Sequence, residues 1–534
     1  MRTLLTLLLL LVASEPARAD VSSALDEYFT RLTEHGFSGA VLVARGERIL
    51  LRGGYGLADR QRGIPARPDT AFNIASLDKQ FIAAGILRLE EMGRLRVTDT
   101  LDRFFDAVPE DKKGITLHQV LSHTAGFPDE YWDEHEDMTR ADFIRWVLTQ
   151  RPLLAPPGTR WSYASFDYWL LEEVIERASG MPFEAFLRRE LFEPAGMRFT
   201  GAALPKWDRG KVARYTLWTL PDSVLPGEAR FTDPLARPPA WRVLLSTADD
   251  LHRWYLALRD GRVLTPESRR KLFTPVMEGY AYGWNVAPTA RGTRLIHHGG
   301  GGNGGSVATF RWFVDEDVFV TVLNNSLMGG FSVDYVMADV EAILFGGSGM
   351  MPPPSAPPDP AAAAKAVGSY RLPRGGTIEV VQAAHGPLVA RSLDPEAVAA
   401  LRFGGTEGSL LPQDALAMSA ATEKWGPLAA VDTLHYRAFS YQGVPETHAY
   451  LRLRSERGDE YVRAIHFPTG KVDLDLQRAP PGIEAVLAPS DDGGYTVWDP
   501  RLGHGVRLHF TEKELHLTGS GGTVTAARVA SEAR

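Results

Sequence analysis

The feature that most constrains the fold is a run of glycine, proline and alanine inside the chain, "GGSGMMPPPSAPPDPAAAA", residues 346–364. It has no hydrophobic periodicity, and its prolines interrupt any helix or central strand, so we expect a linker. The 534-residue chain is long enough for more than one domain. The linker therefore predicts two domains, over residues 20–345 and 365–534.

The two parts differ in pattern. Before the linker, residues 38–56 predict a strand, a turn and a second strand, and residues 76–95 predict a helix. Residues 311–325 predict two further strands around an acidic turn, and residues 334–345 a closing helix. After the linker, short alternating runs such as "HAYLRLR" and "YVRAIHF" are separated by turn residues. We therefore expect a mixed first domain and an all-β second domain, as a small barrel or sandwich.

The N-terminus, "MRTLLTLLLLLVASEPARAD", has the pattern of a secretory signal peptide. Arg2 precedes an apolar run that ends near Ala13, and a small-x-small triplet ends at Ala19. The apolar run is too short to cross a bilayer, and no other run is long enough. We expect residues 1–19 to be removed and the protein to be exported, to the periplasm or the medium, without an integral membrane segment.

Charge and cysteine content exclude several partners. The chain has no cysteine, which excludes a disulfide or a lipid-modified cysteine within it. Loss of Arg2, Arg18 and Glu15 with residues 1–19 changes the net charge from −8 to −9. A mildly acidic protein of this kind is not expected to bind nucleic acid or an anionic membrane.

An S-x-x-K pattern stands inside "FNIASLDKQF", with Ser76 three residues before Lys79. On a helix this spacing places both side chains on one face, whereas Asp78 is expected to point elsewhere. Apolar residues continue at helical spacing behind the serine, so the pair is expected at the start of a core helix. A second S-x-x-K, Ser268 to Lys271, lies among charged residues and is expected to be part of a surface helix.

Three longer blocks carry a resemblance to a known family. They are "GYGLADRQRGIPARPDTAFNIASLDKQFIAAGILRLEEMGRL", "ITLHQVLSHTAGFPD" and "PPGTRWSYASFDYWLLEEVIERASGMPFEAFLRRELFEPAGM". Together they resemble the serine β-lactamase-related hydrolases, a group that includes class C β-lactamases, D-Ala-D-Ala carboxypeptidases, D-aminopeptidases and esterases. The resemblance spans roughly residues 25–345. It implies an α/β (α+β) domain of the β-lactamase/transpeptidase type, with an antiparallel sheet flanked by helices, an all-helical region, and the site between them.

The resemblance also implies roles for single residues. Ser76 matches the acylated nucleophile, Lys79 the lysine of S-x-x-K, and Tyr163 the tyrosine of Tyr-x-Asn. Ser165 stands where that motif has asparagine. A hydroxyl is shorter than a carboxamide and has fewer donors, so Ser165 is less suited to polarise a substrate amide or to orient Lys79.

The third motif of the family, Lys-Thr-Gly or His-x-Gly, aligns with "RLIHHGGGGNGG". We align His297-His298-Gly299 with it, which makes Gly300 the second backbone donor to an oxyanion. The alternative is His298-Gly299-Gly300. Because a histidine is often neutral near pH 7, it binds a substrate carboxylate less reliably than the lysine of Lys-Thr-Gly. The resemblance therefore favours esterases and D-amino-acid peptidases over an efficient β-lactamase.

The chemistry needs a base for Ser76, because a serine hydroxyl is a poor nucleophile until its proton is removed. Two routes are open when a lysine and a tyrosine lie side by side. A cationic lysine favours tyrosinate, and burial favours neutral lysine. No metal-binding spacing such as H-E-x-x-H occurs, so neither metal nor cofactor is expected.

The sequence thus predicts an exported serine hydrolase that cleaves an ester or amide bond of a small molecule or peptide through a Ser76 acyl-enzyme. Two alternatives stay open. One is a D-Ala-D-Ala carboxypeptidase or weak β-lactamase, and the other is a non-catalytic binder or sensor of cell-wall fragments. The substrate, the oligomeric state and the role of residues 365–534 do not follow from the sequence.

Overall fold

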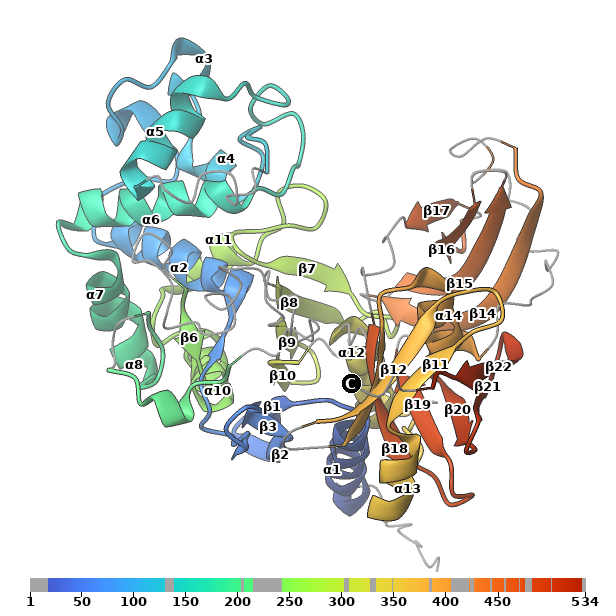
Figure 1. The fold of residues 1–534 in the computed structure, drawn as a ribbon. Helices are drawn as coiled ribbons and strands as arrows, with labels where there is room; N and C mark the ends of the chain where they lie inside the picture. The colour runs from blue at the N-terminus through green and yellow to red at the C-terminus, as the bar shows by residue number, and fades with distance from the viewer. Residues whose placement is uncertain are drawn as a thin grey trace, which may run out of the picture.

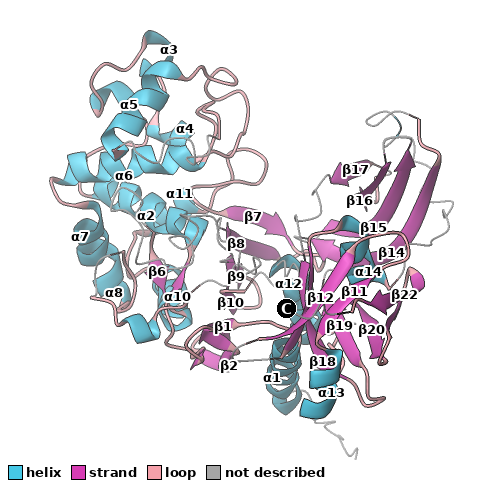
Figure 2. Cartoon of the chain, viewed as in Figure 1, coloured by secondary structure: helices cyan, strands magenta, loops and turns pink. Residues whose placement is uncertain are grey.

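The computed structural model describes most of the chain. The described residues are 18–129, 139–202, 206–214, 243–301, 307–326, 333–347, 349–383, 387–404, 422, 427–441, 444–455, 458–469, 471–475, 483–500 and 502–530. Figures 1 and 2 show these residues as two bodies, a mixed α/β part and a mostly β part, which lie side by side.

The helices and helical turns have the following bounds: α1 (Arg18–Glu34), η1 (Ala75–Leu77), α2 (Asp78–Glu91), η2 (Leu101–Arg103), α3 (Glu110–Lys113), α4 (Leu117–Leu121), α5 (Arg140–Gln150), α6 (Ser165–Ser179), α7 (Phe183–Leu187), η4 (Arg188–Phe192), α8 (Glu193–Ala195), η5 (Arg209–Lys211), α10 (Ala248–Asp260), α11 (Pro266–Leu272), α12 (Val333–Phe345), α13 (Pro360–Ala366) and α14 (Pro395–Phe403).

The strands of the first part are β1 (Gly39–Arg45), β2 (Arg48–Tyr55), β3 (Leu57–Asp59), β4 (Ile64–Pro65), β5 (Phe72–Asn73), β6 (Leu245–Ser246), β7 (Asn285–Pro288), β8 (Arg294–Gly301), β9 (Val307–Phe313) and β10 (Val318–Asn324). Those of the second part are β11 (Gly368–Arg371), β12 (Thr377–Gln382), β13 (Leu388–Ser392), β14 (Ala430–Tyr441), β15 (Val444–Ser455), β16 (Gly458–His466), β17 (Val472–Asp475), β18 (Ile483–Pro489), β19 (Tyr495–Asp499), β20 (His504–Phe510), β21 (Glu514–Gly519) and β22 (Gly522–Arg528).

The first part is built on a six-stranded antiparallel sheet in the order β2-β1-β10-β9-β8-β7. Successive residues of a strand point to opposite faces, and both faces are covered. On one face, Val41 and Val320 pack with α1 and α12. On the other face, Leu42 and Phe319 pack with α2 and α10. Both central strands, β1 and β10, are accordingly almost wholly buried and apolar.

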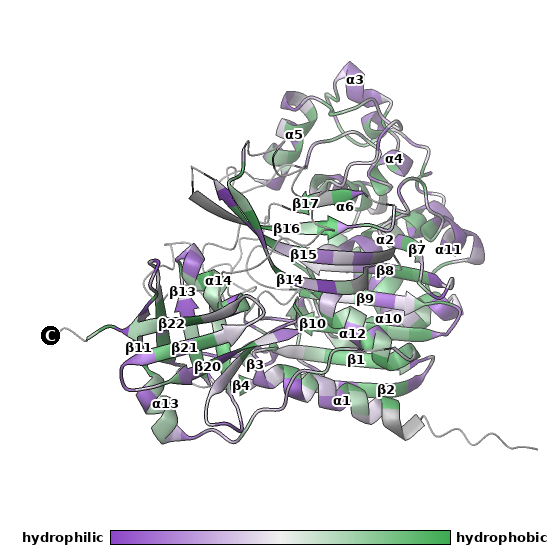
Figure 3. Ribbon diagram, turned by 90° about the vertical axis from the view of Figure 1, so that its right-hand side faces the viewer, coloured by the Kyte–Doolittle hydropathy of each residue, from purple (hydrophilic) through white to green (hydrophobic). Residues whose placement is uncertain are grey.

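Helices α3 to α6 form a separate helical region beyond α2, away from the sheet (Figure 1). Polar residues dominate the short helix α3, whereas polar and apolar residues alternate along α1 (Figure 3). Helix α1 has one exposed and one buried face. The start of α2 lies between the sheet and the helical region (Figure 1). The family resemblance placed the site in this position.

The expected elements of the first part are present, with changes at their ends. Residues 38–56 form β1 and β2, residues 311–325 fall in β9 and β10, and residues 334–345 form α12. The helix expected over 76–95 begins as the turn η1 and ends at Glu91. Gly93 follows with a φ of 69°, which ends the helix because glycine takes this left-handed conformation without strain.

The second part is an eight-stranded closed barrel with a four-stranded sheet beside it. The barrel order is β11-β12-β13-β18-β19-β20-β21-β22, and the sheet order is β14-β15-β16-β17. Side chains such as Tyr370, Leu508 and Leu517 fill the barrel. The expectation of an all-β second part is confirmed. One helix is added to it, α14, which packs its apolar face, including Leu401, against the barrel core.

From Gly349 onward, residues of the expected linker, 346–364, are packed against the two parts. Met351 packs on the cluster between the sheet and α1, and the carbonyl of Pro352 accepts a hydrogen bond from Arg31. The backbone N–H of Ala356 donates to the carbonyl of Pro489 in the barrel. Helix α13 already begins at Pro360. The segment joins the parts by contacts along its length.

The N-terminal prediction lies mostly outside the described residues, which begin at Arg18 with α1. Among the helices that the structure describes, none combines the length and the apolar character needed to cross a bilayer.

Candidate active site

Ser76 lies on the turn η1, immediately before α2. Ala75 has a φ of 44°, an uncommon conformation for a residue with a side chain, and the Asn73 carboxamide oxygen accepts its backbone N–H at 2.8 Å. This Asx-type contact holds the turn that carries the serine. Ser76 itself is half-buried, whereas Leu77 after it is in the core. The turn presents a hydroxyl at the edge of the core.

Lys79 is buried and faces Ser76. Its Nζ donates to the Ser76 Oγ at 3.1 Å. The same nitrogen lies 5.2 Å from the ring centroid of Tyr163 and 5.5 Å from that of Tyr168. Three residues that are separated in sequence by up to 87 positions, Ser76, Lys79 and Tyr163, are thus brought together as the family resemblance implied.

The surroundings of Lys79 decide its charge. Burial alone lowers the pKa of Lys79, but the Tyr163 oxygen, then Asp78 and Asp129, favour the cation, so the pKa is raised above its ordinary value. The expectation that Asp78 points elsewhere is wrong, because its Oδ1 lies 4.0 Å from Nζ at the very start of α2. Lys79 is therefore held as a cation.

The third motif lies on β8, and its alignment with the sequence is decided by which histidine side chain faces α2. His298 pairs with Phe310 of β9 and is on the same face as Ile296, in the cluster that contains α2. His297 is on the opposite face, paired with Arg311. The primary alignment, which began at His297, is therefore corrected to His298-Gly299-Gly300.

Two hydrogen bonds fix the orientation of His298, and burial keeps it neutral against the effect of the Gly299 carbonyl. Its Nδ1 donates to the Gly299 carbonyl at 2.6 Å, so its Nε2 accepts from the Tyr280 hydroxyl at 3.1 Å. Burial, helped by Lys79, lowers the pKa of His298 to about 4. On the other face, burial, Arg311 and His298 lower the pKa of His297 well below its ordinary value. Neither histidine supplies a positive charge near neutral pH.

Gly300 allows β8 to approach the serine turn. A Cβ at this position would lie 2.1 Å from the Ile74 carbonyl oxygen and 3.3 Å from the Ser76 backbone nitrogen. Only glycine fits there. A Cβ on Gly299, by contrast, would meet no atom within 4 Å. With the corrected register, the residue after the motif, and hence the second oxyanion donor that the family implies, is Gly301 in place of Gly300.

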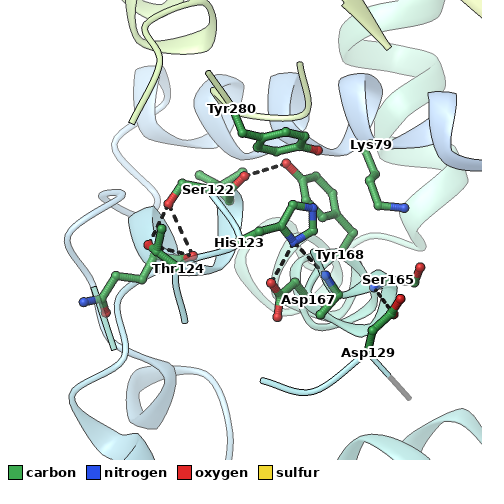
Figure 4. A network of polar contacts seen from close by, with 12 residues as sticks. Lys79, Ser122, His123, Thr124, Asp129, Ser165, Asp167, Tyr168 and Tyr280 are labelled. Carbon is green, nitrogen blue, oxygen red and sulfur yellow. Dashed lines mark hydrogen bonds and ion pairs between the residues drawn. The ribbon is translucent and has the colours of Figure 1, made fainter. Parts of the chain in front are cut away.

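Ser165 is the first residue of α6. Its backbone N–H donates to the Asp129 Oδ1 at 2.9 Å (Figure 4). Within the described residues, its hydroxyl makes no hydrogen bond to Lys79. An exposed carboxylate, that of Asp129, lies at this end of the site instead and favours the Lys79 cation.

Sequence reasoning missed three polar residues of the site. Asp129 stands at the start of an acidic run of the sequence, and Asp167 is hidden between Phe166 and Tyr168 in an apolar helix. Tyr280, which binds His298, comes from the turn before β7. His123 lies beside the site and is fully buried. No local pattern marks Asp167 or Tyr280, because their partners are distant in sequence.

The second S-x-x-K forms no comparable site. Its lysine, Lys271, is 2.9 Å from Glu90 Oε2 in an ion pair. The expectation of a solvated serine is wrong, since Ser268 is buried, where its N–H and hydroxyl contact the Thr265 Oγ1 that caps α11. In this second motif, Ser268 is therefore part of the capping contacts at the start of α11.

Two predicted features lie outside the described residues. These are the pocket residues expected in 130–138 and the later glycines of the run at 302–305. Over the described ranges, no three His, Cys, Asp or Glu side chains gather as a metal site would require.

Comparison with known proteins gives a family match over most of the first part. The family model described as Beta-lactamase matches residues 25–338. Penicillin-binding protein 4* of Bacillus subtilis (strain 168) is 29% identical over 383 residues, which cover 67% of this chain and 84% of that protein. Esterase EstB of Burkholderia gladioli is 29% identical over 379 residues, 61% of this chain and 95% of that protein.

The fold likeness continues into the second part. The octameric penicillin-binding protein homologue from Pyrococcus abyssi superposes with a TM-score of 0.53 at 20% identity, over 88% of this chain and 99% of that one. The likeness at this identity concerns the fold. Taken with the Ser76, Lys79 and Tyr163 cluster and the family match, it leads to one conclusion: the chain belongs to the Beta-lactamase family of serine hydrolases.

Proposed function

We propose that the protein is an exported hydrolase that cleaves an ester or amide bond through an acyl-enzyme on Ser76, and that its substrates carry no carboxylate beside the bond that is cleaved. The observation that carries the proposal is the 3.1 Å hydrogen bond from Lys79 Nζ to Ser76 Oγ, with Tyr163 beside the same nitrogen. The nucleophile Ser76, the Lys79 cation and the Tyr163 phenol therefore lie together.

The charge of Lys79 favours one of the two routes to a base. A lysine held as a cation cannot accept the serine proton, but it stabilises negative charge on the Tyr163 oxygen. Tyr163 is therefore the base in this proposal. It takes the proton of Ser76 as Oγ attacks the carbonyl carbon, and the carbonyl oxygen becomes an oxyanion.

The rest of the cycle follows from this assignment. The N–H groups of Ser76 and Gly301 hold the oxyanion, and each such donor contributes about 10²–10³ in rate. When the tetrahedral intermediate collapses, the bond to the leaving alcohol or amine breaks and the leaving group takes the proton from Tyr163. Water then attacks the acyl-enzyme and gives a proton to Tyr163. Tyr163 passes that proton to the departing Ser76 Oγ as the acid is released, which restores the starting enzyme.

The charges around the serine support a substrate without a carboxylate. His298, at the position of the lysine in Lys-Thr-Gly enzymes, is neutral because its pKa is lowered to about 4. Lys79 already faces Ser76 and Tyr163, and the exposed carboxylate of Asp129 lies nearby. An esterase among the relatives agrees with this choice. Export is supported by the signal-peptide pattern of residues 1–19.

The test is the intact mass of the protein after incubation with a fluorophosphonate, an activated short-chain ester and a β-lactam. We expect one fluorophosphonate adduct on the wild type and none on Ser76→Ala. We also expect turnover of the ester without hydrolysis of the β-lactam. The matched control is Ser268→Ala in the second S-x-x-K, which should label and turn over like the wild type.

Other results would redirect the assignment. A stable β-lactam adduct with slow ester turnover would favour the carboxypeptidase or weak β-lactamase alternative. Absence of any adduct on a folded sample would contradict the acyl-enzyme and favour a non-catalytic binder. N-terminal sequencing of the protein recovered from outside the cytoplasm tests export, and a start before Asp20 would contradict the predicted cleavage.

A further inference from the structure

His123 holds the backbone on both sides of Tyr163. Its carbonyl accepts the N–H of Ser162 at 2.9 Å, and its ring Nδ1 accepts the N–H of Ala164 at 3.3 Å. The imidazole also packs on the Tyr163 ring, with the two centroids 4.4 Å apart. These contacts restrain the phenol of Tyr163, because they fix the two neighbouring residues as well as the ring.

The His123 Nδ1 has a second partner, and this determines where the protons lie. The Asp167 Oδ2 is 2.8 Å from Nδ1 (Figure 4). If Nδ1 carried a hydrogen directed at Asp167, the N–H of Ala164 would point at a nitrogen without a free lone pair, a donor against a donor. If Nδ1 carries none, it can accept from Ala164, and the short contact to Asp167 then requires a hydrogen on the carboxyl group.

We propose that Asp167 is a neutral carboxylic acid that donates to His123, and that this pair is the positioning unit that holds the base Tyr163. The proposal rests on the proposed function for its effect on catalysis. Its claim about the protons stands on the geometry of His123, Ala164 and Asp167 alone.

Burial agrees with a neutral pair. The side chains of His123 and Asp167 are 0% and 1% exposed. Among the described residues, the second carboxyl oxygen of Asp167 and the Nε2 of His123 have no hydrogen-bond partner. A buried carboxylate oxygen without a partner is costly, whereas the carbonyl oxygen of a protonated acid is less so. Two buried charges with half of their polar atoms unpaired would be an unstable arrangement.

The groups that face the pair come from several elements, and most of their effects favour its neutral form. Burial, Lys79 of α2 and His298 of β8 lower the pKa of His123 well below its ordinary value. Burial and Asp129 raise the pKa of Asp167 well above its ordinary value, against the smaller effect of Lys79. The remaining neighbours of the imidazole are the rings of Tyr163, Tyr168 and Tyr280.

A neutral pair has a consequence for catalysis. The pair holds Tyr163 without placing a charge beside Lys79. Titration of the pair therefore does not disturb the electrostatic interaction between Lys79 and Tyr163. A carboxylate at Asp167 would instead hold a hydrogen on Nδ1, as the aspartate of a Ser-His-Asp triad does for its histidine. The two assignments therefore predict different tautomers of His123.

The deciding experiment compares Asp167→Asn with Asp167→Ala in the full chain. The Asn carboxamide can donate to Nδ1 as a protonated carboxyl does, so we expect kcat near that of the wild type and an unchanged pH profile. Alanine leaves Nδ1 with one donor and the segment 162–164 less restrained. We expect kcat and kcat/KM to fall together, by about 10²-fold, because a small misplacement of a catalytic group costs that much.

A direct readout does not depend on activity. Nitrogen NMR of ¹⁵N-histidine-labelled wild type, with the His123 signals assigned from His123→Asn, should show the Nε2–H tautomer, unchanged between about pH 5 and 8. A hydrogen on Nδ1, or loss of activity in Asp167→Asn as large as in Asp167→Ala, would overturn the neutral pair.

Controls separate this proposal from the proposed function and from general loss of stability. His252 is buried and binds the Gly46 carbonyl at 3.1 Å on the far side of α10, so His252→Ala should lower the unfolding temperature and leave kcat unchanged. If the wild type forms no acyl-enzyme, the proposed function fails while the tautomer measurement still decides the proton assignment. An active wild type with an Nδ1–H His123 rejects the neutral pair alone.

Discussion

Asp78 and Lys79 are consecutive residues at the start of α2, and burial acts on them in opposite ways. The lysine keeps its charge because oxygens surround it. The carboxyl group of Asp78 has Lys79 only at 4.0 Å, and its Oδ1 makes no hydrogen bond within the described residues. Burial therefore raises the pKa of Asp78 to about 6. A carboxyl group of this kind makes stability depend on pH.

The sign of that dependence follows from proton binding. Between about pH 4 and 6 the native state keeps a proton on Asp78 that the unfolded chain, with a pKa near 3.8, has released. The contribution of Asp78 to the free energy of unfolding therefore falls as pH rises through this window, by about 3 kcal/mol in all. Asp78→Asn should remove that fall and be relatively more stable at pH 7 than at pH 4.

Urea unfolding of wild type and Asp78→Asn across this pH range measures the difference directly. Asp142→Asn, which removes an exposed carboxyl group, is the surface control. If the Asp78→Asn difference is constant with pH, the carboxyl group of Asp78 is ionised in the native state throughout.

At the residue scale, the sequence predicts which residues form the site better than it predicts where their side chains point. Ser76, Lys79 and Tyr163 follow from motifs, and the structure brings them together. The choice between His297 and His298 could not be made, because the two differ only in which face of β8 they occupy, and that depends on the pairing with β9. Asp167 is out of reach for a similar reason, since its partner His123 is 44 positions away.

At the element scale, the site depends on how closely β8 approaches the turn η1. Gly300→Ala would place a Cβ 2.1 Å from the Ile74 carbonyl, so the strand or the turn must move. We expect kcat to fall by about 10²-fold and the free energy of unfolding to fall by about 1–3 kcal/mol. Ester turnover and urea unfolding measure the two effects.

The neighbouring glycine provides the matched control. Gly299 is exposed and open on its side-chain face, so Gly299→Ala should change the free energy of unfolding by less than about 0.5 kcal/mol and leave turnover close to that of the wild type. Equal losses in both variants would mean that any side chain on this strand blocks the substrate, which would contradict the role given to the β8–η1 contact.

Element prediction from the sequence worked where periodicity was long and unbroken. The apolar strands 38–56 and 311–325 and the helix 334–345 are of this kind. Helix α14 was missed because its nine residues stand between strands, although Asp394 and Pro395 have the pattern of a helix start. The turn η1 could not be foreseen, since the φ of Ala75 reflects its surroundings and not its side chain.

At the scale of the whole molecule, Asp339 of α12 joins four separate parts of the chain. Its carboxylate accepts from the Tyr28 hydroxyl of α1 at 3.0 Å and from the backbone of Met350 at 2.9 Å. Arg437 of β14 donates to it at 3.2 Å, and both side chains of this ion pair are buried. The β sheet of the second part is thus anchored to the first part through a buried charge pair.

Removing the arginine should release that anchor. Arg437→Ala leaves the Asp339 charge with the Tyr28 and Met350 donors alone, and loss of one partner of a buried pair is strongly destabilising. We expect a loss of about 3 kcal/mol in the free energy of unfolding, at the lower end of such losses because two donors remain.

Denaturant unfolding of Arg437→Ala beside Arg145→Ala tests this expectation. Arg145 pairs with Asp142 on the surface, where both side chains are more than half exposed, so its loss should cost less than about 1 kcal/mol. Similar small effects in both variants would mean that the Asp339 pair does not hold the two parts together.

The packed path of residues 349–359 limits how the barrel can move relative to the hydrolase. A flexible tether would let a module sample a large volume around its neighbour. Here Arg31 binds Pro352, and Ala356 binds Pro489, so the segment acts as a strap that holds the barrel in one position on the surface of the hydrolase. The barrel therefore stays at a set distance from Ser76.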